Sequence, residues 1–268
     1  MNPPEKVIEA RRAIIDRFHR ANYVPTVVID MDAAIDRALS WIDAQNSGRP
    51  AGPGVSLTHV VVKAAAMALR EHIFYNYRYN GRYRIIPDER IDICVPVEAG
   101  DAPALVVVPD ADRLDIAAIA RVFDEKSAEA RAAVSAGPSA IERLERVPIV
   151  AGVVAAAQEI ARAARAFVPA ADERWLAKQR ERAGSFTIND IHAHHVTAMH
   201  GQLASPSIAA LGVLGIRDDV VVTDGRPVTR KVLPLALDFD HKLADAGTAA
   251  RFLAAIRRNL EEPERYCA

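Results

Sequence analysis

The chain has 268 residues, of which 50% are apolar and 26% are charged, and its formal net charge is −1. A chain of this length can bury a sizeable core. This balance excludes a disordered chain and a nucleic-acid binder that relies on a basic field. Two cysteines, Cys94 and Cys267, are too few for a disulfide scaffold or a cysteine-based zinc site.

The sequence gives no sign of export or of membrane insertion. Residues 1–6 lack the apolar core of a signal peptide, and the longest apolar stretch, 147–157, is far shorter than a membrane span. We therefore expect a cytoplasmic protein with no integral membrane segment and no nucleic-acid partner.

Predicted helices and strands alternate along the first half of the chain. Hydrophobic periodicity and β-branched runs predict helices over 7–20, from 32 or 36 to 45, over 56–72 and over 115–134, and strands over 23–31, 83–86, 91–97 and 104–109. The apolar runs of the last two strands suit the interior of a sheet covered by helices. Neither a Gly-x-Gly-x-x-Gly pattern nor a P-loop follows any of these strands, which argues against a nucleotide-binding Rossmann fold.

The second half begins with an Ala-rich segment, 138–182, that is predicted to be helical with basic residues on one side. Its stretch 148–168 has few large apolar residues, so an amphipathic helix packed on its own domain is favoured there over one on a membrane surface or a partner. The later elements are strands over 184–190, 208–215 and 232–237, a hairpin over 220–230 that turns at Asp224-Gly225, and a helix over 248–260.

The strand over 232–237 leads into a segment that carries acid–base chemistry. Its sequence is Asp238-Phe239-Asp240-His241-Lys242-Leu243-Ala244-Asp245-Ala246-Gly247. A histidine at the end of a strand, with a carboxylate four residues on, can be held in one rotamer as a general base. The competing interpretations are a structural histidine at His241 and a helix cap at Asp245.

Four histidines, His192, His194, His195 and His200, follow the strand over 184–190. Strand alternation would place His192 and His194 on one face, and zinc accepts imidazole ligands. However, there is no His-Glu-x-x-His pattern, and Asp190 is the one nearby carboxylate. A polar loop near a substrate channel is therefore favoured over a metal site, and we expect no metal.

Three further residues receive structural interpretations. His59 and Lys63 lie one turn apart on the helix over 56–72, where a solvated or interfacial role suffices. Cys94 lies in an apolar strand and is expected to be an inert core thiol.

The C-terminal third resembles the catalytic domain of the 2-oxoacid dehydrogenase (dihydrolipoyl) acyltransferases, and its His-x-x-x-Asp-Gly-like motif resembles that of chloramphenicol acetyltransferase. That family has a Gly-x-Phe-Thr-Ile-Ser strand, an Ala-x-Leu-Gly-Val strand, a Val-x-Asp-Gly hairpin and a Leu-x-Leu-x-x-Asp-His-Arg-x-x-Asp-Gly strand. The similar segments here are 184–189, 210–213, 222–225 and 235–246, in the same order and at approximately the same spacing. The N-terminal half is similar more loosely.

This resemblance implies an α/β fold, an α+β two-layer sandwich with the mixed sheet and flanking helices of chloramphenicol acetyltransferase. It implies a single acyltransferase-like domain over 1–268 with a helical insertion at about 138–183, and without a lipoyl or peripheral-subunit-binding domain. Relatives form trimers whose active sites lie in channels between subunits. We therefore expect a homotrimer or a higher assembly of trimers, coenzyme A as a substrate, and a lipoyl group supplied in trans by a lipoyl or acyl-carrier protein.

The resemblance also implies roles for individual residues. In the family, the histidine deprotonates a thiol or hydroxyl that attacks an acyl thioester, a serine supports the oxyanion, and the aspartate is structural. Carried over, His241 is the general base and Asp245 is the structural carboxylate. Asn189 stands where the serine is expected. An amide N–H can still donate to an oxyanion, a contribution worth about 10²–10³ in rate; the alternative is a turn residue.

Three departures from the family pattern bear on activity. Asn189 replaces the serine, Lys242 replaces the usual arginine, and Ala246 displaces the glycine by one position to Gly247. Two hypotheses follow. The first is a CoA-dependent acyltransferase acting on a thiol, hydroxyl or amine acceptor; the second is a catalytically weakened trimeric scaffold or partner-binding homologue. A condensation-type enzyme is disfavoured, because those carry two adjacent histidines and this chain has Asp240-His241.

Overall fold

The computed structural model describes residues 25–47, 54–79, 85–99, 102–135, 153, 157, 160, 169–201, 203, 206–223 and 225–267. The predicted helix over 7–20, most of the predicted insertion before residue 169, and Asp224 lie outside these ranges. Among the described residues, no helix is long and apolar enough to cross a membrane.

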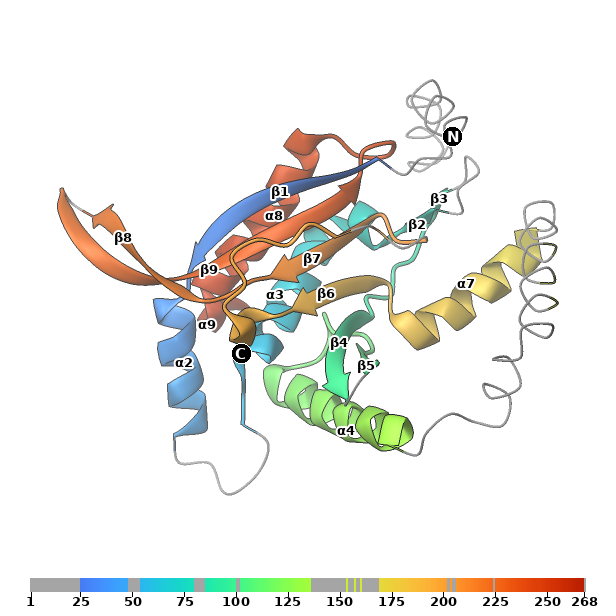
Figure 1. The fold of residues 1–268 in the computed structure, drawn as a ribbon, viewed down its shortest axis with the longest axis horizontal. Coiled ribbons are helices and arrows are strands. Elements are labelled where there is room, and N and C mark those ends of the chain that lie inside the picture. Colours follow the sequence, from blue (N-terminus) through green and yellow to red (C-terminus); the bar gives the residue numbers. More distant parts are fainter. Residues whose placement is uncertain are drawn as a thin grey trace.

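The described chain folds into one large sheet with helices packed on it and a small two-stranded sheet beside it (Figure 1). The strands are β1 (Thr26–Ala34), β2 (Arg78–Tyr79), β3 (Ile85–Ile86), β4 (Ile93–Ala99), β5 (Ala102–Val108), β6 (Phe186–Asp190), β7 (Ala209–Val213), β8 (Arg217–Thr223) and β9 (Arg226–Asp240). The helices are α2 (Asp36–Asn46), α3 (Leu57–Glu71), α4 (Ile116–Ser135), α7 (Pro169–Ala183), α8 (Ala246–Glu261) and α9 (Pro263–Tyr266), with short 3₁₀ helices η1 (Ile73–Asn76) and η2 (His192–His194).

The large sheet has the strand order β1-β9-β7-β6-β4-β5, with β8 paired to β9. Strand β6 runs parallel to both β4 and β7, and the other neighbours are antiparallel. The predicted mixed sheet flanked by helices is therefore confirmed. The prediction of two interior strands is right for β4 but wrong for β5, which forms an edge of the sheet. Helix α4 packs against β5, and Val106 and Val108 of this edge strand are buried. This packing explains why the strand is apolar although it lies at an edge.

Strand β9 differs from the prediction, which divided it into a hairpin arm and a separate strand. It is one continuous strand of 15 residues. Its first part pairs with β8, and from Val232 onward it pairs with β1 and then also with β7. The β8–β9 hairpin projects away from the body of the molecule (Figure 1). The same strand thus passes from an exposed ribbon into the centre of the sheet as its partners change.

The core lies between the sheet and helices α3 and α8. The residues that alternate along the second half of β9, Leu233, Leu235, Leu237 and Phe239, are fully buried in one cluster with residues of both helices. Phe252 of α8 stacks on Tyr75 with ring centroids 4.6 Å apart and meets Phe186 edge to face at 5.8 Å. Membership of this cluster at every second strand position is the pattern expected where one face of a sheet packs on helices, and the intervening residues of Val232–Asp240 are buried as well.

His59 and Lys63 are buried in α3, so the solvated or interfacial role expected for them is wrong. The His59 Nδ1 accepts a hydrogen bond from the Ser56 backbone N–H at 3.1 Å, and burial lowers the pKa of this imidazole. The Lys63 ammonium donates to the carbonyl oxygens of Asp112 and Leu114 at 2.9 and 2.6 Å. Both side chains therefore use polar partners inside the domain, as buried polar groups must.

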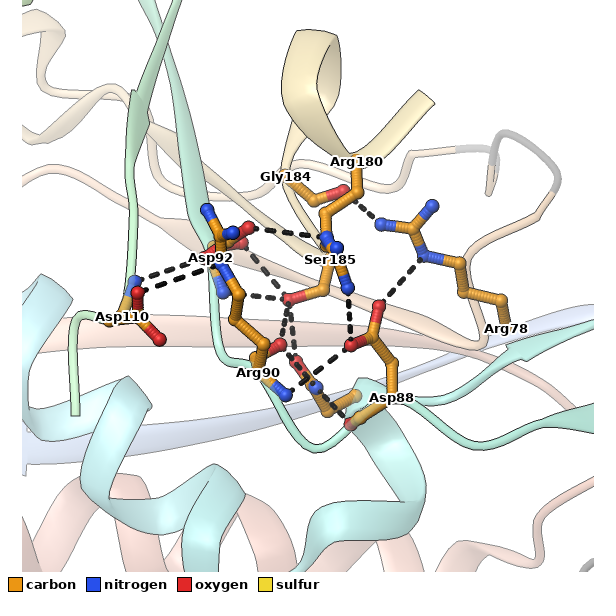
Figure 2. A network of polar contacts seen from close by, with 9 residues as sticks. Arg78, Asp88, Arg90, Asp92, Asp110, Arg180, Gly184 and Ser185 are labelled. Carbon is orange, nitrogen blue, oxygen red and sulfur yellow. Dashed lines mark hydrogen bonds and ion pairs between the residues drawn. The ribbon is translucent and has the colours of Figure 1, made fainter. Parts of the chain in front are cut away.

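A polar junction fixes the start of β6 (Figure 2). The Asp92 carboxylate, 1% exposed, lies 2.9 Å from Arg90 Nε and 3.5 Å from Arg180 Nε, and it accepts the Asp110 N–H at 2.9 Å. The Ser185 hydroxyl donates to Asn76 Oδ1 at 2.6 Å and accepts the Asp92 N–H at 2.9 Å. Side chains from α7, from η1 and from the loops before β4 and β6 thus meet where the chain enters β6.

Gly184 is required in this junction. Its φ is +62°, a conformation that L side chains rarely adopt, and a Cβ there would lie 2.5 Å from the Asp92 carbonyl oxygen. The Gly184 carbonyl accepts a hydrogen bond from the buried Arg78 guanidinium at 2.9 Å. Arg78 in turn lies 3.7 Å from Asp88, which also pairs with Arg180 at 2.9 Å.

Replacing Asp92 with Asn is expected to lower the free energy of unfolding by about 3 kcal/mol, because it removes the charge that two guanidinium groups share in a buried site. Urea denaturation at fixed protein concentration measures this change. Glu129→Gln is the control: it breaks an exposed ion pair with Lys126, 3.0 Å long, and should cost at most about 1 kcal/mol. Equal effects of the two substitutions would contradict a structural role for the junction.

Candidate active site

His241 follows the last residue of β9 and is held at both backbone and side chain. Its backbone N–H donates to the Pro25 carbonyl at 2.9 Å, and its Nδ1 lies 2.8 Å from the Ala244 carbonyl oxygen. A carbonyl can only accept, so Nδ1 carries the ring proton and Nε2 presents a lone pair. Phe239 meets the ring edge to face with centroids 5.8 Å apart. The imidazole is therefore held in one orientation at the end of β9.

Lys242, which stands in place of the family arginine, helps to shape the same turn. Its side chain is buried, with Nζ 3.3 Å from Asp240 Oδ2 and 5.3 Å from the centre of the Tyr79 ring. The other Asp240 oxygen accepts the Lys242 backbone N–H at 2.9 Å. The substitution therefore keeps a cation paired with the carboxylate that precedes His241.

Asp245 occupies the N-cap position of α8, as the sequence allowed. Its side chain forms no capping hydrogen bond, and its carbonyl oxygen accepts the Thr248 N–H at 3.0 Å and the Thr248 hydroxyl at 2.8 Å. His241 and Asp245 are thus brought together in one turn between β9 and α8.

Asn189 lies within β6 and not in a turn. It pairs with Gly212 of β7, which pairs with Ala236 of β9. His241 is five residues beyond Ala236, so it lies about 16 Å further along the sheet and two strand spacings away, roughly 19 Å in all. A single chain therefore does not bring Asn189 and His241 together.

A polar cluster that the sequence did not predict lies at the end of β6, apart from the Asp92 junction and from the turn that holds His241. Asp190 Oδ2 accepts a hydrogen bond from the Thr58 hydroxyl at 2.6 Å, and Asp190 Oδ1 lies 2.6 Å from His192 Nδ1. Oδ1 also accepts the His192 backbone N–H at 3.2 Å. Thr58 is in the first turn of α3, so the carboxylate joins that helix to β6. The Asp-x-His spacing of Asp190 and His192 is visible in the sequence, whereas the contact with Thr58, 132 positions away, is not.

The expected common face for His192 and His194 is wrong, because the two residues lie in η2 and not in an extended strand. His192 pairs with Asp190, whereas His194 Nε2 pairs with Glu98 at 3.0 Å on an exposed part of the surface. In the described part of the chain, no group of three or more His, Cys, Asp or Glu residues could hold a metal ion.

The hydrogen bond to Asp190 raises the pKa of the His192 imidazole. Burial opposes ionisation of Asp190, but the hydrogen bonds from His192 and Thr58 outweigh it, so the pKa of this carboxyl lies below its usual value. Cys94 is buried as expected, and burial raises the pKa of its thiol to about 12, so it stays protonated. The thiolate is the reactive form, so this thiol is inert.

A family model for the catalytic domain of the 2-oxoacid dehydrogenases acyltransferase matches residues 3–136 and 146–268. The chain belongs to this family. The matched residues include α7, which lies in the segment predicted to be an insertion, so the extent of that insertion stays a prediction.

Among curated relatives, the dihydrolipoyllysine-residue acetyltransferase component of the acetoin cleaving system of Bacillus subtilis is 26% identical over 213 residues. That alignment covers 79% of this chain and 43% of the relative. The chain thus spans less than half the length of this acyltransferase component.

Solved structures show the same fold. The cubic core of the pyruvate dehydrogenase multienzyme complex aligns with a TM-score of 0.69 and 20% identity, covering 96% of this chain and 90% of that one. The dihydrolipoamide acetyltransferase of Azotobacter vinelandii was solved to study a serine, a histidine and an asparagine of its mechanism. It aligns with a TM-score of 0.68 and 20% identity, covering 98% of this chain and 91% of that one. A chloramphenicol acetyltransferase aligns with a TM-score of 0.53 and 15% identity, covering 95% of this chain and 94% of that one. The predicted chloramphenicol acetyltransferase-like fold is confirmed.

Replacing His192 with Gln is expected to lower the free energy of unfolding by roughly 1.5–3 kcal/mol below pH 6.5, the range for a hydrogen bond to a charged group. The folded pKa of His192 is raised, so this stabilisation is complete below the unfolded pKa of about 6.5 and declines as pH rises through the folded pKa. Denaturation of both proteins at a series of pH values measures the difference. His194→Gln, at an exposed pair, should change stability by less than about 1 kcal/mol. A difference that grows with pH would contradict the dyad.

Proposed function

We propose that this chain is an acyltransferase core that moves an acyl group between a CoA or lipoyl thioester and a thiol, hydroxyl or amine acceptor. The observation that carries the proposal is the oriented His241, whose Nδ1 is 2.8 Å from the Ala244 carbonyl oxygen in a chain of the acyltransferase family. A base held in one tautomer needs no reorganisation before it takes a proton.

In the proposed reaction, His241 Nε2 takes the acceptor's proton as the acceptor atom attacks the thioester carbonyl carbon. The carbonyl oxygen becomes an oxyanion, to which the Asn189 amide donates. The C–S bond then breaks, and the departing sulfur takes a proton from the His241 imidazolium. The carboxylate of Asp245 is assigned the structural role of holding the turn.

The spacing of these residues supports their assignment. In the Azotobacter enzyme, the serine and the histidine under study are 52 positions apart, and the histidine and the asparagine are four apart. Asn189 and His241 are likewise 52 positions apart, and Asp245 is four beyond His241. Three positions agree in order and interval, although only the histidine keeps its residue type.

We further propose that a complete site needs two chains. A gap of roughly 19 Å along the sheet separates Asn189 from His241 within one chain, too far for both to reach one carbonyl group. The β8–β9 hairpin also exposes apolar side chains, with Val220 at 63% and Val222 at 75% exposed. A homotrimer, or a higher assembly like the cubic core of the pyruvate dehydrogenase complex, would bury this ribbon and bring the two residues together.

The proposed substrates are coenzyme A and a lipoyl group carried by a separate lipoyl or acyl-carrier protein. These follow from the dihydrolipoyllysine acyltransferases that the chain resembles, of which it covers only the catalytic part.

His241→Ala is expected to lower kcat by about 10²–10⁴, the usual contribution of a general base. Transfer from acetyl-CoA to dihydrolipoamide is the assay, and His194→Gln, at the exposed pair, is the control that should keep wild-type activity. Full activity in His241→Ala would overturn the proposed base.

Co-expression of His241→Ala with Asn189→Asp chains tests the two-chain site. Each variant alone should be inactive, because one lacks the base and the other places a carboxylate where an oxyanion forms. In mixed trimers about one interface in four would pair both native residues, so activity should recover to about a quarter of wild type. Mixed trimers, verified by native mass spectrometry, that stay inactive would contradict a shared site.

The weakened trimeric scaffold remains the second candidate function, because Asn189 replaces the serine donor. Titration calorimetry with CoA, together with the transfer assay, separates the scaffold from the enzyme. A scaffold is expected to form a stable trimer that binds no CoA compound and transfers no acetyl group. CoA binding with turnover supports the enzyme.

A further inference from the structure

The dyad formed by Asp190 and His192 has the geometry of an oriented acid–base pair, separate from His241. Both carboxylate oxygens of Asp190 are engaged, one by the Thr58 hydroxyl and the other by His192. Because Nδ1 of His192 faces the carboxylate, Nε2 points away from it, and within the described residues Nε2 makes no hydrogen bond. The His192 side chain is 26% exposed, so this nitrogen can meet a ligand.

The loop that carries His192 is rigidly built. The Ile191 N–H donates to the Val213 carbonyl and the Gly215 N–H donates to the Val196 carbonyl, at 2.9 and 2.8 Å. His195 adopts a left-handed conformation with φ of 52°, and a Cβ at Gly215 would lie 2.5 Å from the His195 Cα. Left-handed non-glycine residues are held only where their surroundings over-determine them. The loop therefore presents His192 in a defined position.

His192 lies close to the position of the oxyanion donor. Three residues can span at most about 11 Å, so His192 Cα is within that distance of Asn189 Cα, whereas His241 of the same chain is roughly 19 Å away. Glu98 at the end of β4, Asp190 at the end of β6 and His192 gather at the carboxyl ends of the parallel strands. This edge is where open sheets with parallel strands bind ligands.

We propose that His192, oriented by Asp190, donates a hydrogen bond from Nε2 to a negatively charged oxygen of the bound thioester substrate. This inference rests on the proposed acyltransferase function and adds a donor to it. The negative oxygen is either the oxyanion that develops on the acyl carbonyl or a phosphate of coenzyme A. The carboxylate of Asp190 favours the imidazolium form, and a cationic donor forms a stronger hydrogen bond to an anion than a neutral one.

The donor also has a chemical rationale in this chain. Asn189 takes the position of the serine hydroxyl, so a second donor at the same end of β6 supplements a changed one. Preorganised donors of this kind contribute about 10²–10³ in rate when they act on an oxyanion.

His192→Gln and wild type are compared with two acetyl donors, acetyl-CoA and S-acetyl-N-acetylcysteamine, each with dihydrolipoamide as acceptor. The second donor carries the same thioester without phosphates. If the oxyanion is the partner, kcat falls about 10²-fold with both donors. If a phosphate is the partner, KM rises for acetyl-CoA alone and the small thioester is unaffected.

His194→Gln is the matched control. It makes the same substitution two residues along the loop, at a histidine whose exposed pair with Glu98 is no part of the dyad. General damage to the loop would give both variants similar losses, whereas a donor role confines the kinetic loss to His192→Gln. Thermal unfolding of each variant shows that it is folded.

The inference is overturned if folded His192→Gln keeps the wild-type kcat and KM with both donors, or if His194→Gln loses as much. These outcomes leave the proposed function intact, since the wild type is still active. A wild type that transfers no acetyl group from either donor overturns the proposed function itself, and the donor role with it.

Discussion

The buried carboxylate of Asp92 and the junction around it set the position of β6. The Asp92 backbone carbonyl accepts the N–H groups of Ser185 and Phe186 at 2.7 and 3.3 Å, while its carboxylate faces two guanidinium groups. Strand β6 begins at Phe186, so the junction fixes its register against β4 and β7. A slip of one residue would exchange the faces on which Asn189 and Asp190 lie. The polar groups at the far end of β6 therefore depend on an ion-pair network at its near end.

The sheet separates the candidate chemistry into two groups. His241 and Asp245 lie where β9 ends, and Asn189, Asp190 and His192 lie where β6 ends. Because β9 runs antiparallel to β7, and β6 runs parallel to β7, the C-terminal ends of β9 and β6 point to opposite ends of the sheet along the strand direction. Each chain thus carries the proposed base at one end of the strands and hydrogen-bonding groups at the other. The proposed assembly of copies would bring the two groups, from different chains, into one site.

The residues that depart from the family pattern have polar groups suited to their positions in the fold. Lys242 places a buried cation beside Asp240, so the turn that holds His241 contains an ion pair. Asn189 keeps a place on the strand and offers an N–H donor instead of a hydroxyl. Asp190 and His192 match no motif. The Asp190 carboxylate bonds both the His192 ring and the Thr58 hydroxyl, each at 2.6 Å. The altered residues thus preserve or add polar contacts around the proposed site.

The sequence by itself determined the types of most elements, the mixed sheet and the place of His241 at a strand end, because periodicity, turn residues and motif order are local properties. It did not determine that β9 is one strand, that β5 is an edge, or that His59 and Lys63 are buried. Each of these depends on which segments pair or pack across the fold. The contact of Thr58 with Asp190 joins residues 132 positions apart, and the separation of Asn189 from His241 follows from strand order. Only the tertiary structure decided these, since local sequence carries no record of distant partners.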